Sequence, residues 1–136
     1  MYHLNFNSAV PLYEQIEKQT QFLIASGALR EDKIIPSVRE VSKRFAINPL
    51  TVSRAYTNLK NQGLIRPLRG LGYVVTSGAR RKCRRARLEF FQTLIEDALA
   101  EAALGKLSID DMREIIDSAL QKTIEKYYSE SKGDRS

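Results

Sequence analysis

The sequence has few of the side chains that carry most catalytic and metal chemistry. Among its 136 residues there is one cysteine, Cys83, and one histidine, His3. A single cysteine excludes an internal disulfide and a cysteine metal site, and this scarcity fits a reducing compartment. The acidic residues are spread over predicted helix surfaces, so no nucleophile with its base and no metal cluster can be assembled. We therefore expect no enzyme activity and no metal or other cofactor.

Long apolar segments are absent as well. No apolar run approaches the roughly 20 residues that span a bilayer. Residues 1–10 have neither the basic start nor the apolar core of a secretory signal. A chain of 136 residues has room for one compact domain and an appendage. We expect a cytoplasmic protein with no membrane partner.

Charge is distributed unevenly along the chain. Residues 1–76 carry ten Lys or Arg and five Asp or Glu, residues 77–87 carry six and none, and residues 88–136 carry six and eleven. The three segments therefore have net charges of +5, +6 and −5. Because phosphates attract the first two segments and repel the third, we expect a polyanion to bind residues 1–87.

Two short helices separated by a tight turn are predicted between residues 37 and 63. The first begins at Ser37, whose hydroxyl can accept a hydrogen bond from the Glu40 amide in a capping box. The second has Asn48 as its N-cap and ends at Gly63, which can adopt a left-handed conformation. One face of the second helix is predicted to be buried, because apolar residues recur at helical spacing at Val52, Ala55, Tyr56 and Leu59.

A β-hairpin is predicted directly after these helices. Leu64–Pro67 and Gly72–Thr76 are rich in β-branched and aromatic residues and flank a turn that contains arginine and glycine. A further helix is predicted from Pro11 to Ser26, and Ile34–Ile35 is expected to add a short strand to the sheet. This order predicts a mainly α fold. It is a winged helix-turn-helix of three helices plus a small β-hairpin wing, a unit that holds one helix in a DNA groove.

Five segments carry a resemblance to a known family. They occur in order over roughly residues 8–76, as PLYEQI (11–16), PSVREVS (36–42), NPLTVSRAY (48–56), LKNQGLI (59–65) and RGLGYVV (69–75). With these segments the chain resembles the GntR family of bacterial transcription regulators, and within it the small YtrA-type branch. The resemblance implies a DNA-binding winged helix followed by a short two-helix C-terminal region in place of a large ligand-binding domain.

Two positions depart from the family's pattern. Many GntR proteins have an arginine where this chain has Ser53 and a glycine where it has Ala46, so the family's base contacts cannot be transferred as a set. A left-handed alanine would cost on the order of 1 kcal/mol relative to glycine. We therefore expect Ala46 to adopt the right-handed conformation.

The expected base contacts lie on the two helices of the helix-turn-helix. Arg39 and Arg54 have the planar guanidinium that suits guanine edges. Thr51 and Ser53 can reach either bases or phosphates, and Leu50 can contact a thymine methyl group.

The expected phosphate contacts surround these residues. Ser37, Lys43, Arg44 and Arg69 are predicted phosphate anchors, and the chain at Gly70 is bare enough to approach the minor groove. For Lys43 and Arg44, a solvated surface charge is an equally good interpretation.

The basic run RRKCRRAR, residues 80–87, has two interpretations. It is either a solvated charge run, such as a helix start, or a direct contact to phosphates beside the wing. Cys83 within it is interpreted as a free structural cysteine. The alternative is an oxidisable thiolate, which the flanking arginines would favour.

Residues 88–136 are predicted to form a helical hairpin. Apolar residues recur at helical spacing on both sides of Gly105, and Ser108 with Asp111 begins the second helix. A hairpin of this size cannot form its own core, so we expect two chains to pair in a homodimer. The expected interface residues are Leu88, Phe91, Ile95, Met112, Ile116 and Leu120. The alternative is that both helices fold back on the winged helix of the same chain, and residues 129–136 are expected to fray.

These patterns predict a division into three parts and a function. Residues 1–76 are the predicted DNA-binding domain, 77–87 a basic linker and 88–136 a helical dimerisation region. The function is a homodimeric transcriptional regulator, which we expect to be a repressor, bound to double-stranded DNA at an inverted-repeat operator. The alternative is a protein-interaction or adaptor module without sequence-specific DNA binding. An unidentified small-molecule effector would have to bind between protomers or between hairpin and wing.

Overall fold

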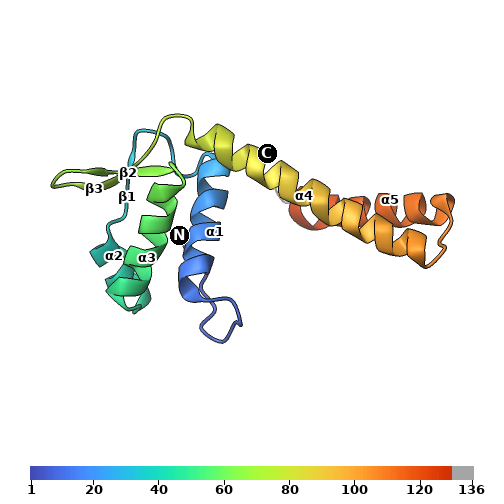
Figure 1. Ribbon diagram of the computed structural model, residues 1–136, viewed down its shortest axis with the longest axis horizontal. Helices are drawn as coiled ribbons and strands as arrows, with labels where there is room; N and C mark the ends of the chain where they lie inside the picture. The colour runs from blue at the N-terminus through green and yellow to red at the C-terminus, as the bar shows by residue number, and fades with distance from the viewer. Residues whose placement is uncertain (130–136) are drawn as a thin grey trace. The chain divides into compact units, whose positions relative to one another are not determined.

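A computed structural model describes residues 1–129 of the chain, which is mainly helical with one small sheet (Figure 1). The predicted fold class is confirmed: a winged helix-turn-helix is followed by two helices. We predict a frayed end over residues 129–136, and all of these except Ser129 lie outside the described residues. The elements are α1 Leu12–Ser26, β1 Ile34–Ile35, α2 Val38–Phe45, α3 Pro49–Asn61, β2 Ile65–Leu68, β3 Gly72–Val75, α4 Ala79–Leu104 and α5 Ile109–Tyr127.

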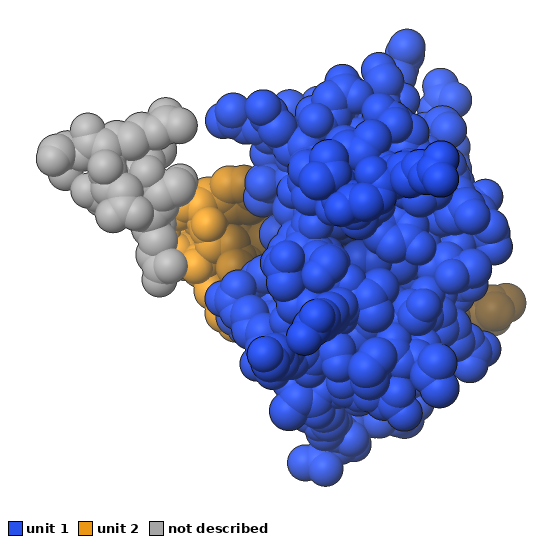
Figure 2. Space-filling model, turned by 90° about the vertical axis from the view of Figure 1, so that its left-hand side faces the viewer, with its two compact units in different colours: residues 1–89 blue, residues 90–136 orange. Residues whose placement is uncertain are grey.

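The chain divides into two compact units, residues 1–89 and 90–136, which Figure 2 shows in different colours. The division falls within α4, so the segment 77–87 that we predict as a linker is helical from Ala79 onward and belongs to the first unit. None of the described helices is both long and apolar enough to cross a membrane.

The helix boundaries follow the predicted caps. The Ser37 hydroxyl accepts a hydrogen bond from the Glu40 amide at 3.1 Å, and the Asn48 side chain accepts one from the Leu50 amide at 2.9 Å. After α3, Gly63 has a φ of 76°. That conformation lets the following amide, of Leu64, donate to the Leu59 carbonyl at 3.1 Å, which satisfies a carbonyl at the helix end.

The prediction for Ala46 was wrong. Ala46 ends α2 with φ 52° and ψ 50°, which is the left-handed conformation. The short turn between α2 and α3 requires it, because Ile47 both donates its amide to the Ser42 carbonyl at 3.0 Å and accepts the Ser42 hydroxyl at 2.6 Å. The two bonds close the turn and offset the conformational cost to alanine.

The three strands form an antiparallel sheet in the order β1-β3-β2. The predicted strand at Ile34–Ile35 is present, with Ile34 opposite Val74. The hairpin β2–β3, which we call the wing, pairs Ile65 with Val75 and Leu68 with Gly72. Each of its two strands begins and ends within one residue of its predicted boundaries.

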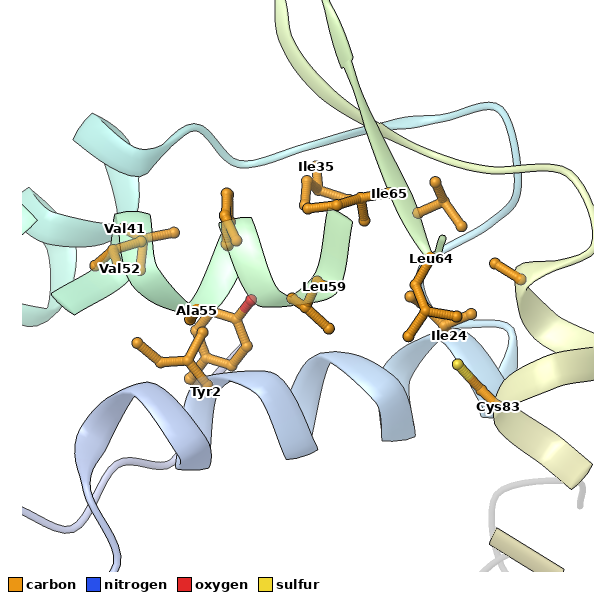
Figure 3. Close-up of a cluster of buried hydrophobic side chains, with 14 of the residues drawn as sticks. Tyr2, Ile24, Ile35, Val41, Val52, Ala55, Leu59, Leu64, Ile65 and Cys83 are labelled. Atoms are coloured by element: carbon orange, nitrogen blue, oxygen red, sulfur yellow. The ribbon is translucent and has the colours of Figure 1, made fainter. Parts of the chain in front are cut away.

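The core of the first unit lies between α1, α3 and the sheet (Figure 3). The predicted face of α3 is buried, and Ile16 and Ile24 of α1 pack against it. The N-terminal segment contributes as well, because Tyr2 is buried and its hydroxyl lies 2.7 Å from that of Thr20. The core therefore also contains Tyr2, which precedes α1, and Cys83, which lies in α4. Sequence periodicity does not connect these two residues with the other core residues.

The N-terminal segment is hydrogen-bonded to α1. The Gln19 side chain accepts from the His3 amide and donates to the His3 carbonyl, both at 2.8 Å. The Gln15 side chain bonds both backbone groups of Asn5 in the same way, at 2.9 and 3.0 Å. Two glutamines one helical turn apart thus hold the segment along α1, where a sequence pattern shows only polar surface residues.

Candidate nucleic-acid interface

The front of α3 is open to solvent. Leu50, with 76% of its surface exposed, lies on the side of the helix opposite the buried stripe. Thr51 and Ser53 are half-buried, and Arg54 is exposed. An apolar side chain that is this exposed gains nothing from the fold of the chain. We call these four residues the reading face, and base contacts were predicted from them and from Arg39 of α2.

The predicted residues of α2 are also on the surface. Arg39, Lys43 and Arg44 are exposed, and the Arg44 guanidinium lies 5.6 Å from the centre of the neighbouring Phe45 ring. Ser37 is half-buried and its oxygen accepts the capping hydrogen bond, so only its O–H can be donated to a further partner.

The tip of the wing is formed by Arg69 and Gly70. Both are exposed, and a β-carbon added to Gly70 would meet no atom within 4 Å. Gly70 has a φ of 78°, so a larger residue there would be strained by its backbone and not by its surroundings. The end of the wing next to its turn lies close to the start of α2, because a β-carbon on Gly72, the first residue of β3, would be 4.0 Å from the Ser37 β-carbon.

Tyr56 links the recognition helix α3 to both of these elements. Its hydroxyl donates to the Pro36 carbonyl at 2.6 Å, directly before α2, and its ring meets Tyr73 of the wing edge-to-face with centroids 5.3 Å apart. Burial is the main cause that raises the pKa of Tyr56 above its usual 10.0, and the neighbouring Tyr2 adds to it. The neutral hydroxyl therefore stays a donor, and it fixes α2, α3 and the wing in one arrangement.

Arg54 makes a contact that the sequence reasoning did not include. Its guanidinium lies over the ring of Tyr13 in α1, with its central carbon 3.8 Å from the ring centroid. Glu17 lies one turn further along α1. Partial burial is the main cause that raises the pKa of Glu17, while Asn58 and the positive charge of Arg54 act in the opposite direction. The predicted base reader thus lies on the α1 side of the recognition helix.

Part of the basic segment is engaged with α1. The Arg80 side chain donates to the Ala25 carbonyl at 3.3 Å, and the Arg87 guanidinium carbon lies 4.0 Å from the centre of the Phe22 ring. Between them Cys83 is buried. Burial raises the pKa of the Cys83 thiol, which opposes the reactive-thiolate interpretation and favours the structural one.

Arg66 is an exposed cation that the predicted site omitted. It lies on β2 opposite Val74, next to the buried Ile65. A charged residue directly after an apolar one at the start of a predicted strand could have indicated that Arg66 is exposed, because successive side chains of a strand point to opposite faces.

The residues predicted for a dimer interface lie on α4 and α5. Leu88, Phe91, Ile95, Ile116 and Leu120 are exposed, and Met112 is half-buried. No residue of α5 is buried within the described chain. The helix itself begins as predicted, with the Ser108 hydroxyl accepting from the Asp111 amide at 3.0 Å.

Comparison with known proteins agrees with this arrangement. The family model "Bacterial regulatory proteins, gntR family" matches residues 12–75, from the start of α1 to the end of the wing. The HTH-type transcriptional repressor YtrA of Bacillus subtilis is 28% identical over 116 residues, which are 85% of this chain and 89% of that protein.

Solved structures extend the comparison. YtrA from Sulfolobus acidocaldarius, a GntR-family transcription factor, is 34% identical with a TM-score of 0.54, over 68% of this chain and 95% of that one. A transcriptional regulator from Oenococcus oeni has a TM-score of 0.73 over 88% of this chain and 99% of that one, and at 23% identity this likeness concerns the fold. The predicted likeness to the YtrA-type branch is confirmed by these relatives. The chain belongs to the GntR family of bacterial regulatory proteins, a family of transcription factors.

Proposed function

We propose that this protein is a homodimeric repressor that binds an inverted-repeat operator. The observation that carries the proposal is the solvent-exposed reading face of α3, next to exposed cations on α2 and on the wing. A relative that is similar over most of its length, YtrA of Bacillus subtilis, is named as a transcriptional repressor. Bound at an operator, the dimer would exclude RNA polymerase.

Within each half-site, the side chains divide by chemistry. Arg39 and Arg54 present guanidinium groups to base edges, and Leu50 offers an apolar contact to a thymine methyl group. Thr51 and Ser53 donate to bases or phosphates. Arg69 and the exposed α2 cations neutralise phosphates, which strengthens binding to every sequence and makes it depend on salt.

The dimer is proposed from the apolar faces of α4 and α5. Large apolar side chains are exposed on both helices, among them Phe91, Leu94, Ile116 and Leu120. Contiguous exposed apolar surface of this kind marks an interaction site in a soluble protein. A second copy of the chain is the occupant that also gives two recognition helices, as an inverted repeat requires.

The operator can be found by selecting duplexes from a random library with the full-length protein. We expect an enriched inverted repeat with half-sites about 10 bp apart or at a multiple of that spacing. Arg54→Ala is then expected to weaken binding to the selected duplex by about 1–3 kcal/mol and to relax its base preference. Arg69→Ala should weaken binding to selected and unselected duplexes alike. No enrichment of any sequence would contradict the proposal and favour the adaptor function.

The dimer is tested separately by sedimentation. Ile95→Glu and Ile116→Glu place charges on the exposed apolar faces, and each is expected to convert a dimer into a monomer. The matched controls are Glu96→Gln and Asp117→Asn, which change exposed acidic neighbours on the same helices. A wild-type protein that sediments as a monomer at micromolar concentration would refute the proposed dimer.

A further inference from the structure

We infer that Tyr13 is a positioning residue for DNA recognition, which holds the Arg54 guanidinium ready for a base edge before DNA binds. The inference rests on the proposed function, because it assigns Arg54 to base contact. Tyr13 itself is assigned no contact with DNA.

The geometry of the pair carries the inference. The guanidinium carbon of Arg54 lies over the Tyr13 ring at 3.8 Å from its centroid, a separation that suits a planar guanidinium stacked on the ring. The N–H donors of a guanidinium lie in its plane and point outward from its edge. A ring on one face therefore leaves the edge available for the two acceptors of a guanine.

Tyr13 is suited to this task because it is itself held in place. It is half-buried and packs against the core of the first unit, and its hydroxyl donates to the Glu14 carboxylate at 3.2 Å. Arg54 is exposed, and a free arginine of this kind would occupy many rotamers. Stacking on a ring that is packed into the core reduces those rotamers before DNA arrives, so less conformational entropy is lost on binding.

Two carboxylates of α1 lie beside the pair. Glu14 accepts the hydrogen bond from the Tyr13 hydroxyl. The pKa of Glu17 is raised, mainly by partial burial, and the positive charge of Arg54 acts against that shift. Acidic neighbours of this kind favour a cation at the position of Arg54.

The experiment is a double-mutant cycle on the full-length protein with two probes. They are the duplex selected by the wild type and a scrambled duplex of equal length. Tyr13→Leu removes the ring and keeps apolar volume, and we expect about three- to tenfold weaker binding to the selected duplex and unchanged binding to the scrambled one. Tyr13→Phe keeps the ring and should bind within about twofold of the wild type. In an Arg54→Ala background, Tyr13→Leu should have no further effect.

A spectroscopic readout separates the stack from DNA binding. Because the ring shields protons over its face, the Arg54 Nε proton in the free wild-type protein should show an upfield NMR shift, present in Tyr13→Phe and absent in Tyr13→Leu. Thermal unfolding of each variant checks that it is folded.

The outcomes distinguish this inference from the proposed function. An equal loss from Tyr13→Leu with and without Arg54 would overturn the inference, and so would a loss in Tyr13→Phe as large as in Tyr13→Leu. An unshifted Arg54 Nε proton in the wild type would also overturn it. If the wild type selects no duplex at all, the proposed function has failed, whatever the NMR shift.

Discussion

The turn between α2 and α3 offers a measurable test of the fold, through Ala46→Gly. Ala46 has φ 52° and ψ 50°, where an L-residue with a β-carbon costs roughly 1–2 kcal/mol relative to glycine. Glycine loses about 0.4–1 kcal/mol more conformational entropy on folding. Ala46 is exposed, so removing its β-carbon sacrifices little packing. The difference predicts that Ala46→Gly stabilises the protein by about 0.8 kcal/mol.

Thermal unfolding at a fixed protein concentration measures this gain. For a unit of 89 residues, it corresponds to a rise in melting temperature of roughly 3–6 °C. The matched control is Ala86→Gly, an exposed alanine inside α4, where glycine is expected to cost about 1 kcal/mol. The reasoning is refuted if Ala46→Gly melts at or below the wild-type temperature while Ala86→Gly shows its expected loss.

Three further predictions concern the core. Tyr56→Phe removes the donor to the Pro36 carbonyl and should cost about 1–3 kcal/mol in urea unfolding. Because the pKa of Tyr56 is raised in the folded state, its hydroxyl ionises just above pH 10 only in the unfolded state. This group should therefore lower the free energy of unfolding of the wild type by up to about 1.4 kcal/mol for each pH unit above 10. Tyr56→Phe should make the free energy of unfolding depend less steeply on pH in that range. Tyr2→Ala should lower the free energy of unfolding by about 3 kcal/mol, whereas Phe6→Ala, an exposed control, should change it little. A loss in Tyr2→Ala as small as that in Phe6→Ala would mean that residues 1–7 do not stabilise the fold. Cys83 should react slowly with a disulfide reagent until urea is added, because its thiol is buried. Peroxide should leave DNA binding unchanged. A loss of DNA binding after peroxide treatment that Cys83→Ala prevents would restore the redox interpretation.

The elements that the sequence predicted well are those determined by local chemistry. Ser37, Asn48 and Ser108 cap helices through side chains that reach amides two or three residues ahead, so sequence spacing alone indicates them. The wing was equally predictable, because β-branched and aromatic residues on either side of a glycine turn are local features as well. Interactions within a few residues carry little loop-closure cost and therefore leave a clear pattern.

What the sequence did not predict depends on contacts between distant residues. Tyr2 meets Thr20 across 18 positions, and Arg80 bonds the Ala25 carbonyl across 55. Periodicity describes one face of one element, so it cannot say that a residue before α1 or at the start of α4 completes the core. Ala46 is a different case, in which an intrinsic preference was correctly weighed but local hydrogen bonds offset it. The two hydrogen bonds that close the turn join Ser42 and Ile47, and the preference of alanine alone does not reveal them.

The candidate site likewise combines features that local sequence predicts with contacts between distant residues. Exposure of the reading face followed from the helical period, yet the orientation of Arg54 comes from α1, more than 40 positions earlier in the chain. The same helix is bonded at its far end by Arg80 of α4. Helix α1 thus contacts the recognition helix near its start and the basic segment near its end, within one unit of residues 1–89. A substitution in α1 is therefore expected to alter the pose of Arg54, the proposed base reader, without touching α3, and under the proposed function DNA selectivity is not a property of the recognition helix alone.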